Sequence, residues 1–190
     1  MPDQLPFPGF RPAPTTDRFL LAIRPDAEAA TQAVALARDV AQEHGLTGPP
    51  IPCERLHVSL FGLAPARPLA KLVAAAGAAI DPRWPAFDLA FDRMASFGRR
   101  SNRPLVVFGD DGSGGLLDFA EALGDALEEA GLARPLPLAW TPHMTLLYDR
   151  VPLPEQAIAP IGWRVREIVL LRSLVGRGRH VLLGRWPLAG

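Results

Sequence analysis

The same short pattern occurs twice in the sequence: a histidine, then any residue, then a hydroxyl residue and a leucine. His57 with Ser59 forms the first copy, and His143 with Thr145 forms the second. Residues i and i+2 of a β-strand project from the same face, about 6 to 7 Å apart along the strand. If each copy lies on a strand, each histidine therefore points the same way as its hydroxyl partner.

Two such pairs facing each other would form a set of groups suited to phosphodiester chemistry. Imidazole titrates near neutral pH, so a neutral histidine can take a proton from water while a protonated one donates to a leaving oxygen. The hydroxyls of Ser59 and Thr145 would hold the non-bridging phosphate oxygens. No cluster of carboxylates, cysteines or histidines has the spacing of a metal site. The sequence therefore predicts attack by water with His57 and His143 as the catalytic residues, and no metal or cofactor.

The composition limits the kind of partner that we expect. Of the 190 residues, 20 are basic and 20 are acidic, so the net charge does not favour long nucleic acids or an anionic membrane. We therefore expect RNA ends or nucleotides as substrate. Separately, we expect a monomer. The single cysteine, Cys53, cannot form an internal disulfide, and the sequence has neither a signal peptide nor an apolar run of membrane-spanning length. These features predict a cytoplasmic protein that binds no membrane.

Hydrophobic patterning predicts strands and helices in alternation. Apolar runs predict strands at 19–23, 54–62 and 87–91, with helices at 26–44 and 67–80 between them. Asp26 can cap the first helix, and His44-Gly45 can end it. The pattern then restarts with a strand at 104–109, a helix at 113–130 and a strand through His143, followed by strands near 163–172 and 179–186.

The restart predicts an internal duplication. Adding 86 to each residue number maps strand 17–24 onto 103–110, helix 26–44 onto 112–130, and His57 onto His143. Mixed strands and helices in two similar halves favour an α+β fold. We expect duplicated strand-helix-strand units in one bilobal domain over residues 17–190, after a flexible proline-rich arm at 1–16.

Three further segments add to the two histidine motifs: residues 17–25, Trp140-Thr141-Pro142 and residues 176–188. With them the chain resembles the 2H phosphoesterases, and among these the bacterial RNA 2',3'-cyclic phosphodiesterases, also called 2'-5' RNA ligases. The resemblance implies antiparallel sheets on both sides of a central groove. It also implies hydrolysis of terminal 2',3'-cyclic phosphates to 2'-phosphates, with ligation as the reverse reaction. In this family the first-motif histidine, here His57, acts as acid to the leaving 3'-oxygen, and the second, here His143, activates water.

The sequence departs from the family pattern at two positions. Many members have a phosphate-binding arginine five residues after the second histidine, where this chain has Tyr148. Regular pleating would turn Tyr148 away from His143 unless the strand bulges. Arg150, Arg177 or Arg179 could supply the missing charge. The base-stacking aromatic of the family is displaced by one position to Phe61, which we retain as a candidate.

Two alternatives to the cyclic phosphodiesterase remain open. Tyr148 and the displaced aromatic also fit a nucleotide- or RNA-binding module that keeps the groove but has weak or no catalysis. A third possibility is a 2H phosphoesterase acting on another linkage, such as a 2'-5' oligonucleotide or an ADP-ribose cyclic phosphate.

Overall fold

The computed structural model describes residues 17–63, 68–98, 101–109, 114–133 and 140–190. The arm predicted at residues 1–16 lies outside these ranges. The elements, in chain order, are β1 (Arg18–Ile23), α1 (Ala27–His44), the short 3-10 helix η1 (Cys53–Arg55), β2 (Val58–Leu63), α2 (Leu69–Ala79), β3 (Phe87–Ser96), β4 (Arg103–Phe108), α3 (Gly114–Glu129), β5 (His143–Asp149), β6 (Gln156–Val165), β7 (Glu167–Leu174) and β8 (Arg179–Pro187).

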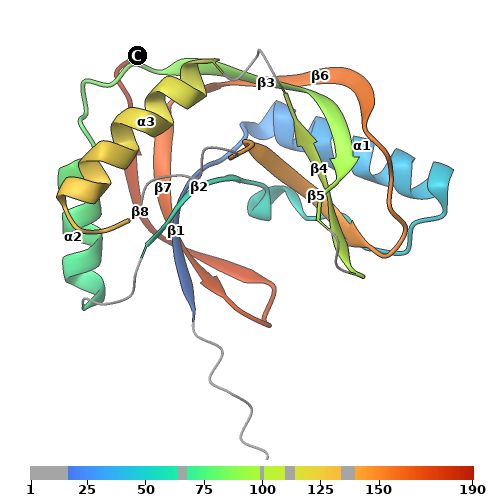
Figure 1. Cartoon of the computed structure of the whole chain (residues 1–190), viewed down its shortest axis with the longest axis horizontal. Coiled ribbons are helices and arrows are strands. Elements are labelled where there is room, and N and C mark those ends of the chain that lie inside the picture. The colour runs from blue at the N-terminus through green and yellow to red at the C-terminus, as the bar shows by residue number, and fades with distance from the viewer. Residues whose placement is uncertain (1–16, 64–67, 99–100, 110–113, 134–139) are drawn as a thin grey trace, which may run out of the picture.

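The strands form one antiparallel sheet in the order β6-β3-β4-β5-β2-β1-β7-β8. Its two halves meet at β5 and β2, which share a single paired position, Val58 opposite Met144. From that point the halves diverge, as Figure 1 shows. The units β1-α1-β2 and β4-α3-β5 occupy equivalent places on either side of the joint, which confirms the predicted bilobal, duplicated α+β fold.

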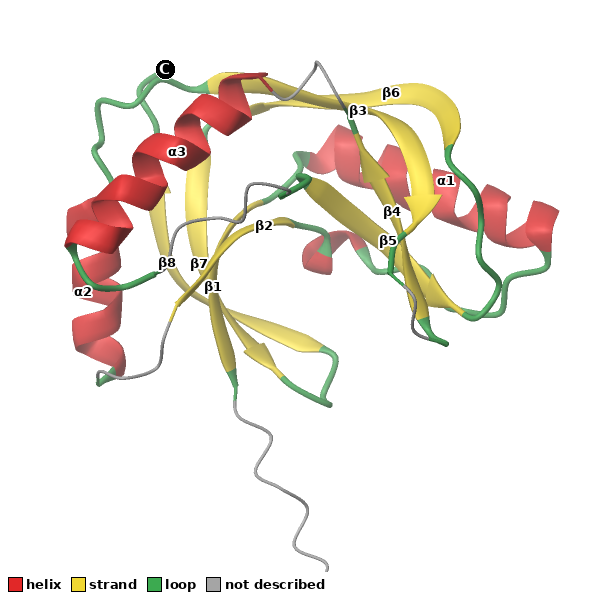
Figure 2. Ribbon diagram, viewed as in Figure 1, coloured by secondary structure: helices red, strands yellow, loops and turns green. Residues whose placement is uncertain are grey.

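The helices lie on one face of the sheet, with α1 on the half that contains β5 and β6 and with α2 and α3 on the half that contains β7 and β8 (Figure 2). Helix α1 contacts β5 and β6, whereas α2 and α3 pack together and α2 contacts β8. Helix α3 also contacts β3. Helix α1 begins and ends as its sequence predicts. The Asp26 side chain accepts a hydrogen bond from the Ala29 N–H at 2.9 Å, and Gly45 ends the helix at φ 63°, a left-handed conformation that glycine adopts without strain.

Two predicted strands differ from the structure. The strand expected at 54–62 begins only at Val58, because Cys53–Arg55 form a turn of 3-10 helix. The run expected as one strand at 163–172 is extended throughout, but it divides between β6 and β7 at Arg166. Strand β6 pairs with β3 in one half of the sheet, and β7 pairs with β1 and β8 in the other. A local apolar pattern cannot show that one extended run changes partners.

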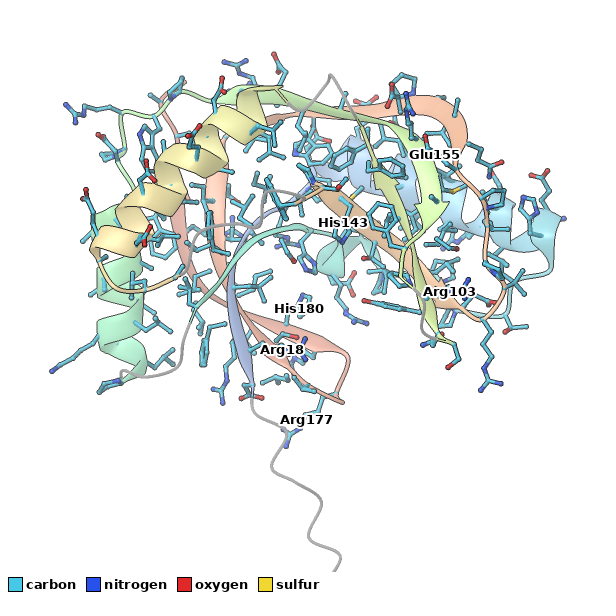
Figure 3. The ribbon with its side chains drawn as sticks, in the orientation of Figure 1. Arg18, Arg103, His143, Glu155, Arg177 and His180 are labelled. Carbon is cyan, nitrogen blue, oxygen red and sulfur yellow. The ribbon has the colours of Figure 1, made fainter. Side chains whose placement is uncertain are left out.

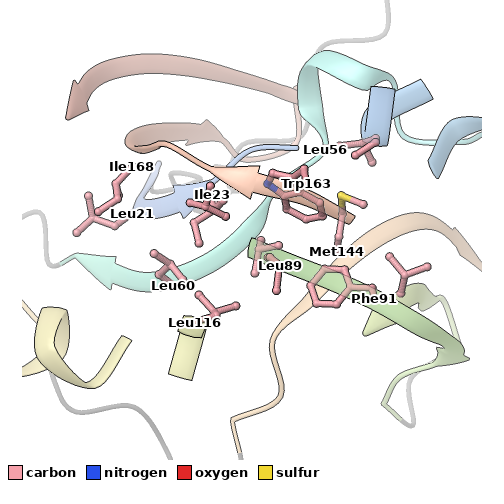
Figure 4. Packing of buried hydrophobic residues seen from close by; sticks show 14 of the residues in the cluster. Leu21, Ile23, Leu56, Leu60, Leu89, Phe91, Leu116, Met144, Trp163 and Ile168 are labelled. Atoms are coloured by element: carbon pink, nitrogen blue, oxygen red, sulfur yellow. The ribbon is translucent and has the colours of Figure 1, made fainter. Parts of the chain in front are cut away.

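The main hydrophobic core lies between the sheet and the helices and runs through both halves (Figure 4). Two small apolar clusters lie on the other face, one in each half: Ala22, Val169 and Leu171, and Ala95, Val106 and Phe108. We call this second face the open face. None of the helices in the described part of the chain is long and apolar enough to cross a membrane.

Candidate active site

The two histidine motifs meet at the joint between the halves of the sheet. Val58 and Met144 are paired and fully buried in the core. Their neighbours on each strand therefore project from the open face. Continuing this antiparallel register by one residue in each direction places His57 on the side of Thr145 and Ser59 on the side of His143. The structure thus brings together both histidines and both hydroxyls that the sequence predicts.

Each histidine is held by the same backbone contact. His57 Nδ1 lies 2.8 Å from the carbonyl oxygen of Arg55, and His143 Nδ1 lies 2.8 Å from that of Thr141. A carbonyl oxygen only accepts, so Nδ1 carries the hydrogen in both rings. Nε2 is then the atom that gains or loses a proton, and each ring can serve as base when neutral or as acid when charged.

The surroundings of His57 disfavour its charged form. Burial lowers the pKa of His57 below the ordinary 6.5, the hydrogen bond to the Arg55 carbonyl opposes this, and the charges of Arg55, His143 and Arg24 lower it further. His57 in the free protein is therefore mainly neutral at pH 7. A bound phosphate anion would reverse part of this effect, because an opposite charge favours imidazolium.

A third histidine, which has no hydroxyl motif, lies against the first. The ring centroids of His57 and His180 are 4.9 Å apart with an interplanar angle of 79°. Burial lowers the pKa of His180 to about 4, with further contributions from His57, Arg55 and Arg24. Figure 3 shows His180 and His143 in the space between the two halves. The sequence offers no signal for His180, because its contact depends on how the β7–β8 hairpin curls across the sheet.

A β-bulge sets the position of Tyr148. Val106 pairs with Thr145, but Leu105 pairs with Leu147, so β5 has one extra residue between these positions. Leu146 and Leu147 are consequently both buried, and Tyr148 is 46% exposed. The extra residue reverses the alternation, so Tyr148 shares the open face with His143.

The first motif has a bulge at the equivalent point, and it overturns one prediction. Ala22 pairs with Ser59, but Leu21 pairs with Phe61. Phe61 is therefore turned into the core, where it is 3% exposed. A β-carbon at Gly124 of α3 would lie 3.1 Å from the tip of its ring. The prediction of Phe61 as a base-stacking residue is wrong.

A different aromatic residue borders the site. The Phe97 ring is partly buried, and its centroid lies 5.3 Å from that of His143 and 5.2 Å from that of Phe108. Phe97 follows β3, and its N–H donates to the Pro104 carbonyl of β4 at 2.9 Å. The sequence analysis missed it because β3 and β5 are far apart in the chain and are brought together only by β4 between them.

Two arginines near His57 were also missed. An Arg24 nitrogen donates to the Glu54 carbonyl at 2.9 Å, which holds its guanidinium beside η1. The Arg55 Nε is buried and has no hydrogen-bond partner within the described part of the chain. Both arginines act on the pKa of His57, so the site has local positive charge despite the neutral total.

The predicted arginines of the last hairpin are both exposed. Arg177 lies in the loop between β7 and β8, and Arg179 begins β8. The loop borders the site, because a β-carbon at Gly178 would lie 3.5 Å from an Arg55 Nη atom. Phosphate contact by Arg177 or Arg179 stays a prediction. In the described ranges, no group of three histidine, cysteine or acidic side chains is placed to hold a metal ion.

Comparison with protein families is consistent with this geometry. The family model described as the 2'-5' RNA ligase superfamily matches residues 12–177. The chain belongs to this superfamily. No curated protein matches the sequence.

Several solved structures share the fold of this 2'-5' RNA ligase superfamily member. Apo LigT of E. coli is 28% identical, with a TM-score of 0.66 over 92% of this chain and 98% of that one. LigT complexed with 3'-AMP is 28% identical, with a TM-score of 0.67 over 92% and 99% of the two chains. TT0787 of Thermus thermophilus is 22% identical, with a TM-score of 0.70 over 91% and 98%, and shows the fold alone.

Proposed function

We propose that this protein hydrolyses the 2',3'-cyclic phosphate ends of RNA or small nucleotides to 2'-phosphates, without a metal ion. The observation that carries the proposal is the arrangement of His57, Ser59, His143 and Thr145 around the Val58–Met144 pair on one face of the sheet. Membership of the 2'-5' RNA ligase superfamily supports phosphodiester chemistry. The crystallised complex of LigT with 3'-AMP supports a nucleotide substrate.

In the proposed reaction, a water molecule attacks phosphorus as His143 Nε2 takes its proton. The bond from phosphorus to the 3'-oxygen breaks, and His57 Nε2–H donates its proton to that oxygen. The product carries a 3'-hydroxyl and a 2'-phosphate. Ser59 and Thr145 donate hydrogen bonds to the non-bridging oxygens, whose charge increases in the transition state. Run backwards with a 5'-hydroxyl in place of water, the same groups would perform 2'-5' ligation.

The lowered pKa of His57 has a role in this scheme. An acid that is mainly neutral in the free protein must gain its proton when the substrate arrives. The cyclic phosphate is an anion, and its charge next to His57 favours the imidazolium. Substrate binding would therefore both position the phosphate and favour the protonated form of His57.

In the deciding experiment, the pure protein is incubated in the presence of a chelator. The substrates are each nucleoside 2',3'-cyclic phosphate and a short RNA that has the same end. We expect 2'-phosphate products, and a loss of about 10²- to 10⁴-fold in His57→Ala and in His143→Ala. His44→Ala is the matched control, because His44 is exposed at the end of α1. A 3'-phosphate product, or full activity in either active-site variant, would contradict the proposal.

The second candidate is a nucleotide-binding module with weak or no catalysis. Tyr148 favours it, because an uncharged phenol stands where many family members have an arginine. Saturable nucleotide binding without any product would support this candidate. Turnover of a 2'-5' oligonucleotide or an ADP-ribose cyclic phosphate, but of no 2',3'-cyclic end, would instead indicate another linkage.

A further inference from the structure

A pocket of about 430 Å³ lies at the end of β5, beyond the four residues of the candidate site. Pro49, Pro50 and Ile51 form an apolar wall, and Arg55, Asn102 and Tyr148 add polar and aromatic groups. Apolar walls with a few polar groups are typical of sites for small organic ligands. None of the reaction steps proposed above uses this pocket.

The pocket wall is held in place by backbone contacts. The buried carboxylate of Asp149 accepts hydrogen bonds from the N–H groups of Thr47 and Gly48 at 2.7 and 2.8 Å. The Ile51 N–H donates to the Leu146 carbonyl of β5 at 2.7 Å. A side chain at Gly48 would collide with the Tyr148 carbonyl, so only glycine permits this approach. The pocket is therefore formed before any ligand arrives.

Two of its residues connect the pocket to the candidate site. The Arg55 carbonyl holds His57, and the Arg55 side chain lines the pocket. Tyr148 lies three residues beyond Thr145 on the same face, because of the β5 bulge, and the pocket continues to Asp149 and Arg150. Three residues of strand span roughly 10 Å, and five span roughly 16 Å. A ligand that fills the pocket therefore extends past the nucleoside whose phosphate lies between the histidines, and it can be joined to that nucleoside through a phosphodiester.

We propose that this pocket binds the nucleotide that precedes the cyclic end, so that the preferred substrate is an RNA chain of at least two nucleotides. The inference rests on the proposed function. Tyr148 offers a half-exposed aromatic face on which a base can stack. Asn102 offers an amide that can both donate to and accept from a base edge. Arg55 lines the pocket, and its guanidinium can donate to the intervening phosphate.

The test compares kcat/KM for a dinucleotide and for a mononucleotide that both end in a 2',3'-cyclic phosphate. We expect the dinucleotide to be favoured roughly tenfold, within the range measured for one base stacked on an aromatic side chain. The preference should fall towards one in Tyr148→Ala and decrease in Asn102→Ala. Tyr148→Phe is the matched control and should keep it, because the aromatic face remains. Tyr148 and Asn102 are both exposed, so these variants are expected to fold.

Two results would overturn the proposal. One is an absence of preference in the unmodified protein, and the other is an equal loss on both substrates in Tyr148→Ala, which would assign the pocket to the terminal nucleoside. Calorimetric titration with the mono- and dinucleotide 2'-phosphates separates this proposal from the catalytic one, because it requires no turnover. If no cyclic substrate reacts, but the dinucleotide binds more tightly in a Tyr148-dependent way, the catalytic proposal fails and the pocket assignment stands.

Discussion

The imidazole of His180 stands edge-on to that of His57, with ring centroids 4.9 Å apart. The Arg55 carbonyl contacts the His57 ring at Nδ1, and the His180 ring packs against another side of it. Two protonated rings at this distance would repel each other, and the pKa of His180 is lowered to about 4, first by burial and then by the charge of His57. At neutral pH, His180 is therefore an uncharged ring that shields His57, the proposed acid, from water.

This arrangement predicts that His180 helps to keep the pKa of His57 low. Replacing His180 by alanine would let water reach His57 and weaken the burial effect, which is the largest cause of the shift. We expect the pKa of His57 in the free protein to lie below 6.5 and to rise towards that value in His180→Ala. NMR titration of the imidazole resonances measures this directly.

His180→Phe is the matched control, because phenylalanine keeps the ring and the burial but cannot be charged. It should leave the pKa of His57 low. A value at or above 6.5 in the unmodified protein, or an unchanged value in His180→Ala, would show that His180 does not cover His57 in solution. The rise in the pKa of His57 in His180→Ala should also appear in the pH dependence of kcat/KM, which reports the pKa values of groups in the free enzyme.

The paired register around Val58 and Met144 predicts equal contributions from the two hydroxyls. Each donates to a charged oxygen, and such bonds contribute about 1.5 to 3 kcal/mol. Ser59→Ala and Thr145→Ala should each lower kcat/KM roughly tenfold to hundredfold, while Ser59→Thr and Thr145→Ser stay within a few-fold. Steady-state kinetics on a cyclic nucleotide provides the measurement. A loss in only one of the alanine variants would show that a single motif holds the phosphate.

The sequence was sufficient to predict the parts of this site that depend on short spacing. Both histidine-hydroxyl pairs follow from the alternation of side chains along a strand, and their equivalence follows from the 86-residue repeat. The duplicated core also follows from local apolar patterns, since α1 and α3 occur where helical spacing predicts them.

What could not be predicted depends on register and on long-range contact. The two bulges move Phe61 into the core and turn Tyr148 outward, and a single extra residue leaves no distinct pattern in the sequence. The contacts of His180 with His57 and of Phe97 with His143 join segments that are far apart in the chain. The charge that surrounds His57 comes from Arg24 and Arg55, whose spacing resembles no known motif.

The burial of Phe61 predicts a stability effect in place of a binding effect. Phe61→Ala removes a buried ring that packs against α3, and such changes cost about 3 to 5 kcal/mol of unfolding free energy. Phe61→Leu fills more of the space and should cost less. Urea unfolding measures both, and nucleotide affinity is measured well below the unfolding transition. A Phe61→Ala protein that keeps its stability but binds nucleotide more weakly would show that the Phe61 ring lies on the open face in solution.

Asp149 predicts a pH-dependent contribution to stability. Its carboxylate accepts hydrogen bonds from the N–H groups of Thr47, Gly48 and Val151, and backbone hydrogen bonds lower its pKa from 3.8 to about 2. A pKa that is lower in the folded state stabilises the fold above about pH 4, and the effect is lost as the pH falls through about 2. Asp149→Asn should therefore cost about 1 to 3 kcal/mol at pH 7, and much less at a pH near the lowered pKa.

Asp81 provides the comparison for Asp149. Hydrogen bonds from Arg83 also lower its pKa to about 2, but Arg83 is almost fully exposed, and solvent screens an ion pair of this kind. Asp81→Asn should thus change the unfolding free energy far less than Asp149→Asn at pH 7, although the two carboxyls have similar pKa values. Urea unfolding at pH 7 and at low pH distinguishes them. Equal decreases in unfolding free energy in the two variants would mean that the Asp149 hydrogen bonds do not hold residues 47–48 against β5. The pocket beside Tyr148 would then lack a fixed wall.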